Sequence, residues 1–202
     1  MRKTLTGLTT AVLLAMVLSP AHAQLEVGGD LLDNCSGIDE LQKSGNYSEA
    51  RKLARLCLEG LDQKLEGEVG EYFLEEVAGW RRTSFEQNKA MGLSITSARY
   101  VKGEDSTDVS LTGGAAGGTG MGALGGLAAM GMLQSGRQVR VGGLPAAVNP
   151  DGTILVTLED GSFLSFKSRN YKDADSALAG IGSLVNEFPV ADINRVLVEG
   201  SQ

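Results

Sequence analysis

TILVTLEDGSFLSFK, residues 153–167, decides the fold, because it indicates two apolar strands that meet at a tight turn. Asp160-Gly161 is a dipeptide typical of a two-residue type I′ turn. The stretch therefore predicts a β-hairpin with strands at 153–159 and 162–167. Such a turn sets the pairs Leu158 with Phe163 on one face and Leu155 with Phe166 on the other. Because both faces carry large apolar side chains, we expect cover on both sides of the hairpin.

Short strand patterns and an amphipathic helix surround this hairpin. Further strands are expected at 93–101, 108–112, 138–141 and 146–148. Asp173 is placed to cap a helix whose apolar face consists of Ala174, Ala177, Leu178, Ile181 and Val185. Pro189 interrupts that helix, and residues 192–198 fit either a helix or a strand. The predicted fold of residues 80–202 is α+β, with an antiparallel sheet packed with helices.

Residues 30–65 indicate a helical hairpin ahead of the sheet. Apolar residues recur at helical spacing on both sides of a break at 44–46: Leu31, Cys35, Ile38 and Leu41 before it, and Ala50, Ala54, Cys57, Leu61 and Leu65 after it. Asn46, with Glu49 three residues later, fits a capping box at the start of the second helix.

Cys35 and Cys57 are the two cysteines of the chain, and they lie almost symmetrically about the break. Two antiparallel helices joined by a tight turn bring such mirror positions together. Both cysteines also belong to the apolar faces. We therefore expect a disulfide between them, and the alternative is a pair of buried free thiols.

Two resemblances follow from these patterns. LQKSGNYSEA, residues 41–50, is similar to the helix–turn–helix junction of a tetratricopeptide repeat, and the similarity covers one unit of that repeat. It implies an isolated hairpin that serves as a docking element. The order of elements over Trp80–Val198 resembles that of PsbP-like domains of secreted and lumenal proteins, which implies an α+β sandwich.

Residues 67–79 predict a third helix, so that the hairpin and this helix account for residues 24–79. Its polar face is acidic, which suits a basic partner. Tyr72 and Trp80, eight residues apart, would share one helical face, and an aromatic ring beside arginine is a common interface anchor. The interpretation that we favour is that both rings fill the joint between the hairpin and the sheet. The candidate partner-binding residues are Glu68, Glu71, Tyr72, Glu75, Trp80, Arg81 and Arg82.

The first 23 residues have the three parts of a secretory signal peptide. Arg2 and Lys3 give a positive start, residues 8–18 are apolar, and Ala21-His22-Ala23 fits a cleavage site before Gln24. This pattern is of a bacterial type, so we expect a periplasmic or secreted protein. That compartment also favours the disulfide.

The charge balance bears on the class of partner. The chain holds 18 Lys and Arg against 25 Asp and Glu, a net charge of −7. Loss of Arg2 and Lys3 with residues 1–23 leaves 16 basic side chains against 25 acidic ones, a net charge of −9. Nucleic acids and anionic lipid surfaces need clustered Lys and Arg. We therefore expect no nucleic-acid partner.

The predicted mature sequence has no strong catalytic or metal-binding pattern. His22, the single histidine, lies in the signal peptide, which excludes Ser–His and Cys–His pairs and histidine metal sites. Gly120-x-Gly122-x-x-Gly125 matches a dinucleotide fingerprint, but arginines stand where that motif needs an acidic residue. Three carboxylate pairs are better explained as a helix surface, a turn and a helix cap: Glu75/Glu76, Glu159/Asp160 and Asp173/Asp175. We expect no catalytic residue, cofactor or metal.

Residues 113–136 are glycine-rich and uncharged. Gly114, Gly118, Gly122 and Gly126 recur every four residues, which is the spacing of a glycine zipper. One interpretation is a segment that associates with a membrane. We favour a glycine-rich loop that leads into a short packed helix at 121–133, because glycine costs about 1 kcal/mol at each helical position.

These patterns together predict an exported, soluble, non-catalytic protein that binds another protein or belongs to the cell envelope. The alternative is a membrane-associated protein that uses residues 113–136. A hydrolase that works without histidine, through a Ser–Lys pair or carboxylates, is the third candidate.

Overall fold

The computed structural model describes residues 35–90, 93–114 and 136–200. The predicted signal peptide and most of the glycine-rich segment, residues 115–135, lie outside the described residues. The described chain is α+β, with helices packed on an antiparallel sheet, which confirms the predicted fold class.

The described strands form one eight-stranded sheet in the order β1-β2-β3-β4-β8-β7-β6-β5. Each half is a meander of strands that are neighbours in sequence, and the halves join where β4 pairs antiparallel with β8. The strands are β1 (Glu76–Val77), β2 (Trp80–Ala90), β3 (Leu93–Lys102), β4 (Asp105–Gly114), β5 (Arg137–Val141), β6 (Leu144–Val148), β7 (Ile154–Thr157) and β8 (Phe163–Ser168).

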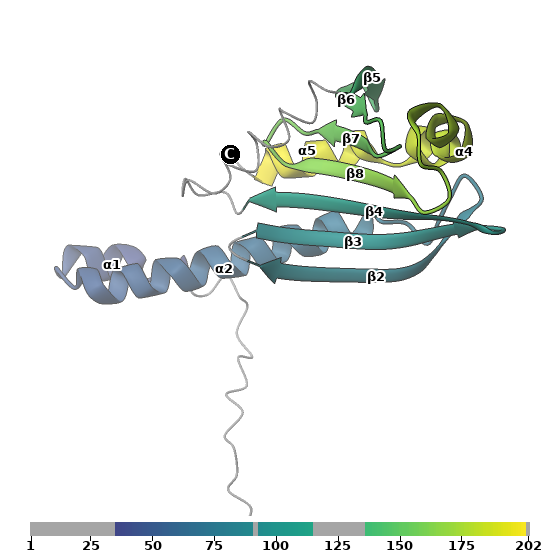
Figure 1. The fold of residues 1–202 in the computed structure, drawn as a ribbon. Helices are drawn as coiled ribbons and strands as arrows, with labels where there is room; N and C mark the ends of the chain where they lie inside the picture. Colours follow the sequence, from purple (N-terminus) through teal and green to yellow (C-terminus); the bar gives the residue numbers. More distant parts are fainter. Residues whose placement is uncertain (1–34, 91–92, 115–135, 201–202) are drawn as a thin grey trace, which may run out of the picture.

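The described helices are α1 (Ile38–Lys43), α2 (Tyr47–Glu71), α4 (Ala174–Glu187) and α5 (Val190–Gly200). In Figure 1, α2 and α5 pass behind the strands, and α4 lies at one end of the sheet. The N-terminal half of α2, together with α1, extends past the end of the strands (Figure 1). We call α1 and this half of α2, residues 38–58, the arm.

The hydrophobic core lies between the helices and one face of the sheet. Phe188, at the end of α4, stands at its centre. Its ring meets the rings of Phe73, Tyr100 and Phe166 edge-on, at centroid distances of 5.5, 5.9 and 5.3 Å. Edge-to-face contacts of this kind add to the free energy gained by burial. One ring therefore links the end of α2 to both halves of the sheet.

The hairpin of residues 153–167 forms, but the predicted turn and register are wrong. Ile154 pairs with Phe166 and Val156 with Leu164, so the predicted pairing is displaced by one residue. Leu158 N donates to Ser162 O at 2.9 Å, which leaves a three-residue loop with Gly161 at φ 87°. Three-residue hairpin loops place glycine at this left-handed position. The Asp160 carboxylate also accepts hydrogen bonds from Ser162 N and Oγ, at 3.0 and 2.6 Å, which stabilises the longer loop.

The predicted third helix at 67–79 is also wrong. α2 runs through Gly67 and Gly70 to Glu71, and the chain then enters β1. A Cβ at Gly70 would lie 3.2 Å from the Phe85 ring, so the close approach of α2 to β2 favours glycine there. β1 and β2 meet at Ala78-Gly79, where both residues have positive φ, 53° and 77°, as in a type I′ turn.

β2 is a strand that the sequence pattern did not predict. Residues 83–89 are exposed and mostly polar, so they lack the alternation of a strand with one buried face. Their pairing with β3 nevertheless runs as far as Ala90 opposite Leu93, with one irregularity between Arg82 and Ser84. β3 and β4 are also longer than predicted, because the turn between them is confined to residues 103–104.

The C-terminal patterns form two helices. Asp173 caps α4 as predicted, and its carboxylate accepts a hydrogen bond from Ser176 N at 2.9 Å. Residues 192–198, which fitted either a helix or a strand, belong to α5. Asn46 is the N-cap of α2, but its side chain makes no capping hydrogen bond, so the predicted capping box does not form. Among the described helices, none is long and apolar enough to cross a membrane.

Candidate functional site

A disulfide fixes the arm. Cys35 and Cys57 are bonded, with their Cα atoms 4.8 Å apart, which confirms the predicted pairing. Cys35 lies ahead of α1 rather than within a long first helix, and α1 itself has only six residues, none of them buried. α1 is therefore too short to cover much of α2, and the disulfide holds it in place.

α2 carries an exposed row of apolar side chains along the arm and at Leu61, three residues beyond it. Tyr47, Leu58 and Leu61 are 69%, 55% and 45% exposed. With the half-buried Ala54 they follow spacings of seven, four and three, so they lie on one face of the helix. We call Tyr47, Ala54, Leu58 and Leu61 the α2 stripe. Exposed apolar residues that adjoin one another mark interaction surfaces more often than scattered ones do.

The α2 stripe continues into the hydrophobic core. Leu65 and Val69 follow Leu61 at four-residue steps on the same face; Val69 is buried in the core and Leu65 packs against it. A Cβ at Gly200, the last residue of α5, would lie 2.8 Å from Leu65 Cδ1. The end of α5 therefore lies against Leu65. The stripe begins one turn closer to the N-terminus of α2, at Leu61.

Polar contacts attach the C-terminal half of α2, next to the arm, to the sheet. Glu66 pairs with Lys89 at 3.1 Å and accepts a hydrogen bond from Ser94 Oγ at 2.6 Å. Partial burial raises the pKa of the neighbouring Asp62 above its usual value; Lys89 opposes this shift, and the carboxylates of Glu66 and Glu59 add to it. The C-terminal half of α2 is thus acidic and anchored.

The predicted partner-binding residues do not share one helical face. Glu68, Glu71 and Glu75 are exposed, as an acidic docking surface requires. Tyr72 follows the last residue of α2 and is half-buried, and Trp80 lies on β2. The prediction of a shared helical face for the two rings is therefore wrong.

Trp80 and Arg82 serve the fold. Trp80 is 1% exposed, and its Nε1 donates to Ser183 Oγ at 3.4 Å, so its ring fills the joint between helix and sheet. The Arg82 guanidinium donates to the Phe73 carbonyl and lies 4.9 Å from the centre of the Phe85 ring. Arg81 is exposed and lies opposite Glu76 in the β1–β2 hairpin.

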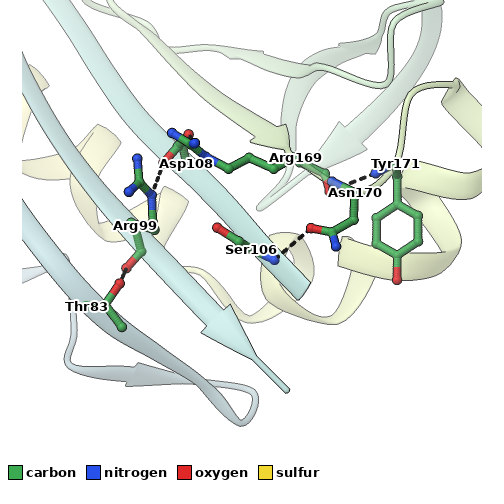
Figure 2. A network of polar contacts seen from close by, with 8 residues as sticks. Thr83, Arg99, Ser106, Asp108, Arg169, Asn170 and Tyr171 are labelled. Atoms are coloured by element: carbon green, nitrogen blue, oxygen red, sulfur yellow. Dashed lines mark hydrogen bonds and ion pairs between the residues drawn. The ribbon is translucent and has the colours of Figure 1, made fainter. Parts of the chain in front are cut away.

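A second polar cluster lies on the sheet face turned away from the helices (Figure 2). Asp108 on β4 accepts hydrogen bonds from Arg99 Nε and Arg169 Nε, each at 2.8 Å. Next to it, Asn170 Oδ1 accepts from Ser106 N at 3.0 Å. All three charged side chains are more than a third exposed, and ion pairs of this kind contribute little free energy. The cluster ties β3 and β4 to the connection between β8 and α4.

Two of the three carboxylate pairs have structural contacts, whereas Glu75 and Glu76 lie beyond the end of α2 and not on a helix surface as predicted. Asp160 holds the hairpin loop, Asp173 caps α4, and Asp175 pairs with Arg137 at 2.9 Å. Within the described ranges, no group of three or more His, Cys, Asp or Glu side chains is placed to hold a metal ion.

Sequence reasoning missed the α2 stripe as a surface. It assigned Ala54, Leu61 and Leu65 to the inner face of a hairpin of two long helices. The signal that could have revealed the stripe is Leu58, because it widens the apolar face of the second helix beyond what one short helix can cover. Comparison of the chain with protein families, curated proteins and solved structures finds no match.

Proposed function

We propose that this chain is an exported, non-catalytic protein that binds another protein through its arm. The observation that carries the proposal is the α2 stripe, whose three large side chains are each about half exposed or more. Burial of such a side chain in an interface contributes about 1.5–3 kcal/mol. A partner that covers the stripe therefore gains affinity from side chains that the described fold leaves in solvent.

The disulfide supports both the binding role and the proposed location. Loop closure between Cys35 and Cys57, 22 residues apart in sequence, restricts the arm before a partner arrives. Preorganisation of this kind lowers the entropic cost of association. Disulfides persist in oxidising compartments. Together with the sequence of residues 1–23, this supports cleavage between Ala23 and Gln24 and a periplasmic or secreted protein.

The test is crosslinking in the compartment to which the chain is exported. A photo-reactive phenylalanine analogue in place of Tyr47, at the first position of the stripe, should capture a discrete protein partner. Leu61→Ser should reduce capture at least tenfold while leaving the melting temperature nearly unchanged. Leu74→Ser is the matched control, because Leu74 is also 45% exposed but lies outside α2.

Two results would contradict this function. Equal capture by the Leu61→Ser and wild-type chains would show that the stripe is not the contact surface. Turnover of an ester, peptide or glycan substrate, lost on replacement of one Ser, Lys or carboxylate, would show an enzyme.

A further inference from the structure

We infer that the α2 stripe binds an amphipathic helix of another protein whose apolar seam is flanked by Asp and Glu, aligned end to end with α5. This inference rests on the proposed function and specifies the chemistry of its partner. It follows from the length of the stripe, from the position of α5 and from the distribution of charge along α2.

The shape of the stripe favours a helix as the occupant. From Tyr47 to Leu61 the stripe spans fourteen residues, or about 21 Å at the rise of an α-helix. α5 already packs against α2, with its end at Gly200 beside Leu65. A helix of about four turns placed beyond Gly200 would continue the packing that α5 begins. The heptad-like spacing of the stripe is that of a helix–helix seam.

The charge along the stripe indicates the character of its flanks. Over the span of the stripe, residues 47–61, α2 holds Arg51, Lys52 and Arg55 against Glu49 and Glu59, a net charge of +1. Residues 62–71 hold four acidic side chains against Lys64, a net charge of −3. Arg51 and Arg55 are one turn apart and lie seven and three residues before Leu58, so they border the stripe. In a chain with a net charge of −7, this basic border favours an acidic partner.

The same charges disfavour a second copy of the chain. If two stripes packed antiparallel about a two-fold axis at Ala54, Arg51 and Arg55 of one copy would lie beside those of the other. Like charges in close contact oppose association. A lipid surface also fits less well, because helices that lie in a membrane interface present a broad apolar face. The stripe is narrow, and α1 takes up part of the remaining surface of this half of α2.

The test uses two designed helical peptides of about 20 residues and the exported full chain. Both peptides carry Leu at heptad positions a and d; one has Glu and the other Lys at the flanking e and g positions. Fluorescence anisotropy at low salt should show at least tenfold tighter binding of the Glu peptide, a difference of about 1.4 kcal/mol. The double variant Arg51→Glu/Arg55→Glu should reverse that preference. Lys172→Glu, in the exposed connection between β8 and α4, should leave it unchanged.

The remaining outcomes separate this inference from the proposed function. If both peptides bind equally and Leu58→Ser weakens both, the stripe still docks a protein but the acidic flank is wrong. Failure of both peptides to bind overturns the inference, and the crosslinking experiment then decides the proposed function alone. A dimer seen by sedimentation and lost in Leu58→Ser would assign the stripe to a second copy. Flotation with anionic phosphatidylglycerol vesicles, lost in the same variant, would assign it to lipid and overturn both.

Discussion

At the scale of single residues, Tyr100 shows how a polar atom is accommodated in the core. Its side chain is fully buried, and its hydroxyl donates to the Leu74 carbonyl at 2.9 Å. Burial raises the pKa of Tyr100 to about 12, although the nearby Arg82 opposes the shift. The hydrogen bond fastens β3 to the segment that follows α2.

We expect Tyr100→Phe to lower the free energy of unfolding by about 1 kcal/mol, because the Leu74 carbonyl loses its donor while the ring remains. Chemical denaturation measures the change. Tyr47→Phe is the control, since Tyr47 is 69% exposed and the substitution should have almost no effect. Equal stability of the two variants would show that the hydrogen bond contributes nothing.

The pKa of Tyr100 also predicts a dependence on alkaline pH. The folded value of about 12 exceeds the value of about 10 expected in the unfolded chain, so the unfolded chain loses this proton first. The contribution of Tyr100 is therefore complete below about pH 10 and is lost as the pH rises towards 12. Between these values the wild-type free energy of unfolding should fall more steeply than that of Tyr100→Phe. Parallel curves would mean that Tyr100 ionises normally.

At the scale of elements, the arm depends on its disulfide more than the sheet does. α1 has no buried residue, whereas every residue of β7 except Thr157 is buried. Closing a loop of this length stabilises a fold by about 3 kcal/mol in the chain-entropy model. The double variant Cys35→Ala/Cys57→Ala should therefore loosen α1 and the start of α2 first.

Hydrogen exchange measures this difference. Amide protection in residues 38–58 should fall in the double variant, while protection in β3, β4 and β8 should be retained near the wild-type level. Dithiothreitol should reproduce the effect in the wild-type chain and have no effect on the double variant. Uniform loss of protection through the sheet would show instead that the arm and the sheet unfold as one unit.

The sequence predicts those elements that carry strong local signals. Asp173 and the apolar face behind it predict α4, and the symmetry of Cys35 and Cys57 predicts the disulfide. β2 escaped prediction because its pairing with β3, rather than its side-chain pattern, makes it a strand. The loop at 159–161 escaped because Asp-Gly suits both two- and three-residue hairpins, and the hydrogen bonds to Asp160 favour the longer one.

The candidate site could be predicted only in part. Periodicity identified Ala54 and Leu61 as apolar helix positions, but it does not tell which neighbour covers them. That depends on the lengths of α1 and α5, which are set by packing: α1 ends after six residues, and α5 ends against Leu65. The sequence also placed Trp80 near the joint between helix and sheet. Its burial depends on the end of α2 at Glu71, which the sequence pattern did not predict.

At the scale of the whole molecule, one core connects the C-terminal half of α2, from which the arm extends, to both halves of the sheet. Val69 and Phe73 on one side, and Ile181 and Phe188 on the other, belong to the same cluster of buried side chains. Force or strain applied to the arm by a bound partner would therefore reach the core through a continuous helix. Cooperative unfolding is the expected behaviour of residues that share such a core.

Phe188→Ala tests this connection. Its ring contacts Phe73, Tyr100 and Phe166, so truncation leaves a cavity between α2, β3 and β8 and should cost about 3–5 kcal/mol of unfolding free energy. Phe85→Ala is the matched control, because Phe85 also contacts the Phe73 ring, at 5.9 Å, but is 37% exposed and should cost much less.

Circular dichroism and tryptophan fluorescence should report one coincident transition in the Phe188 variant, since Trp80 lies in the same core. If fluorescence changes before the sheet unfolds, the half that contains Trp80 is held independently, and the arm is coupled only to that half.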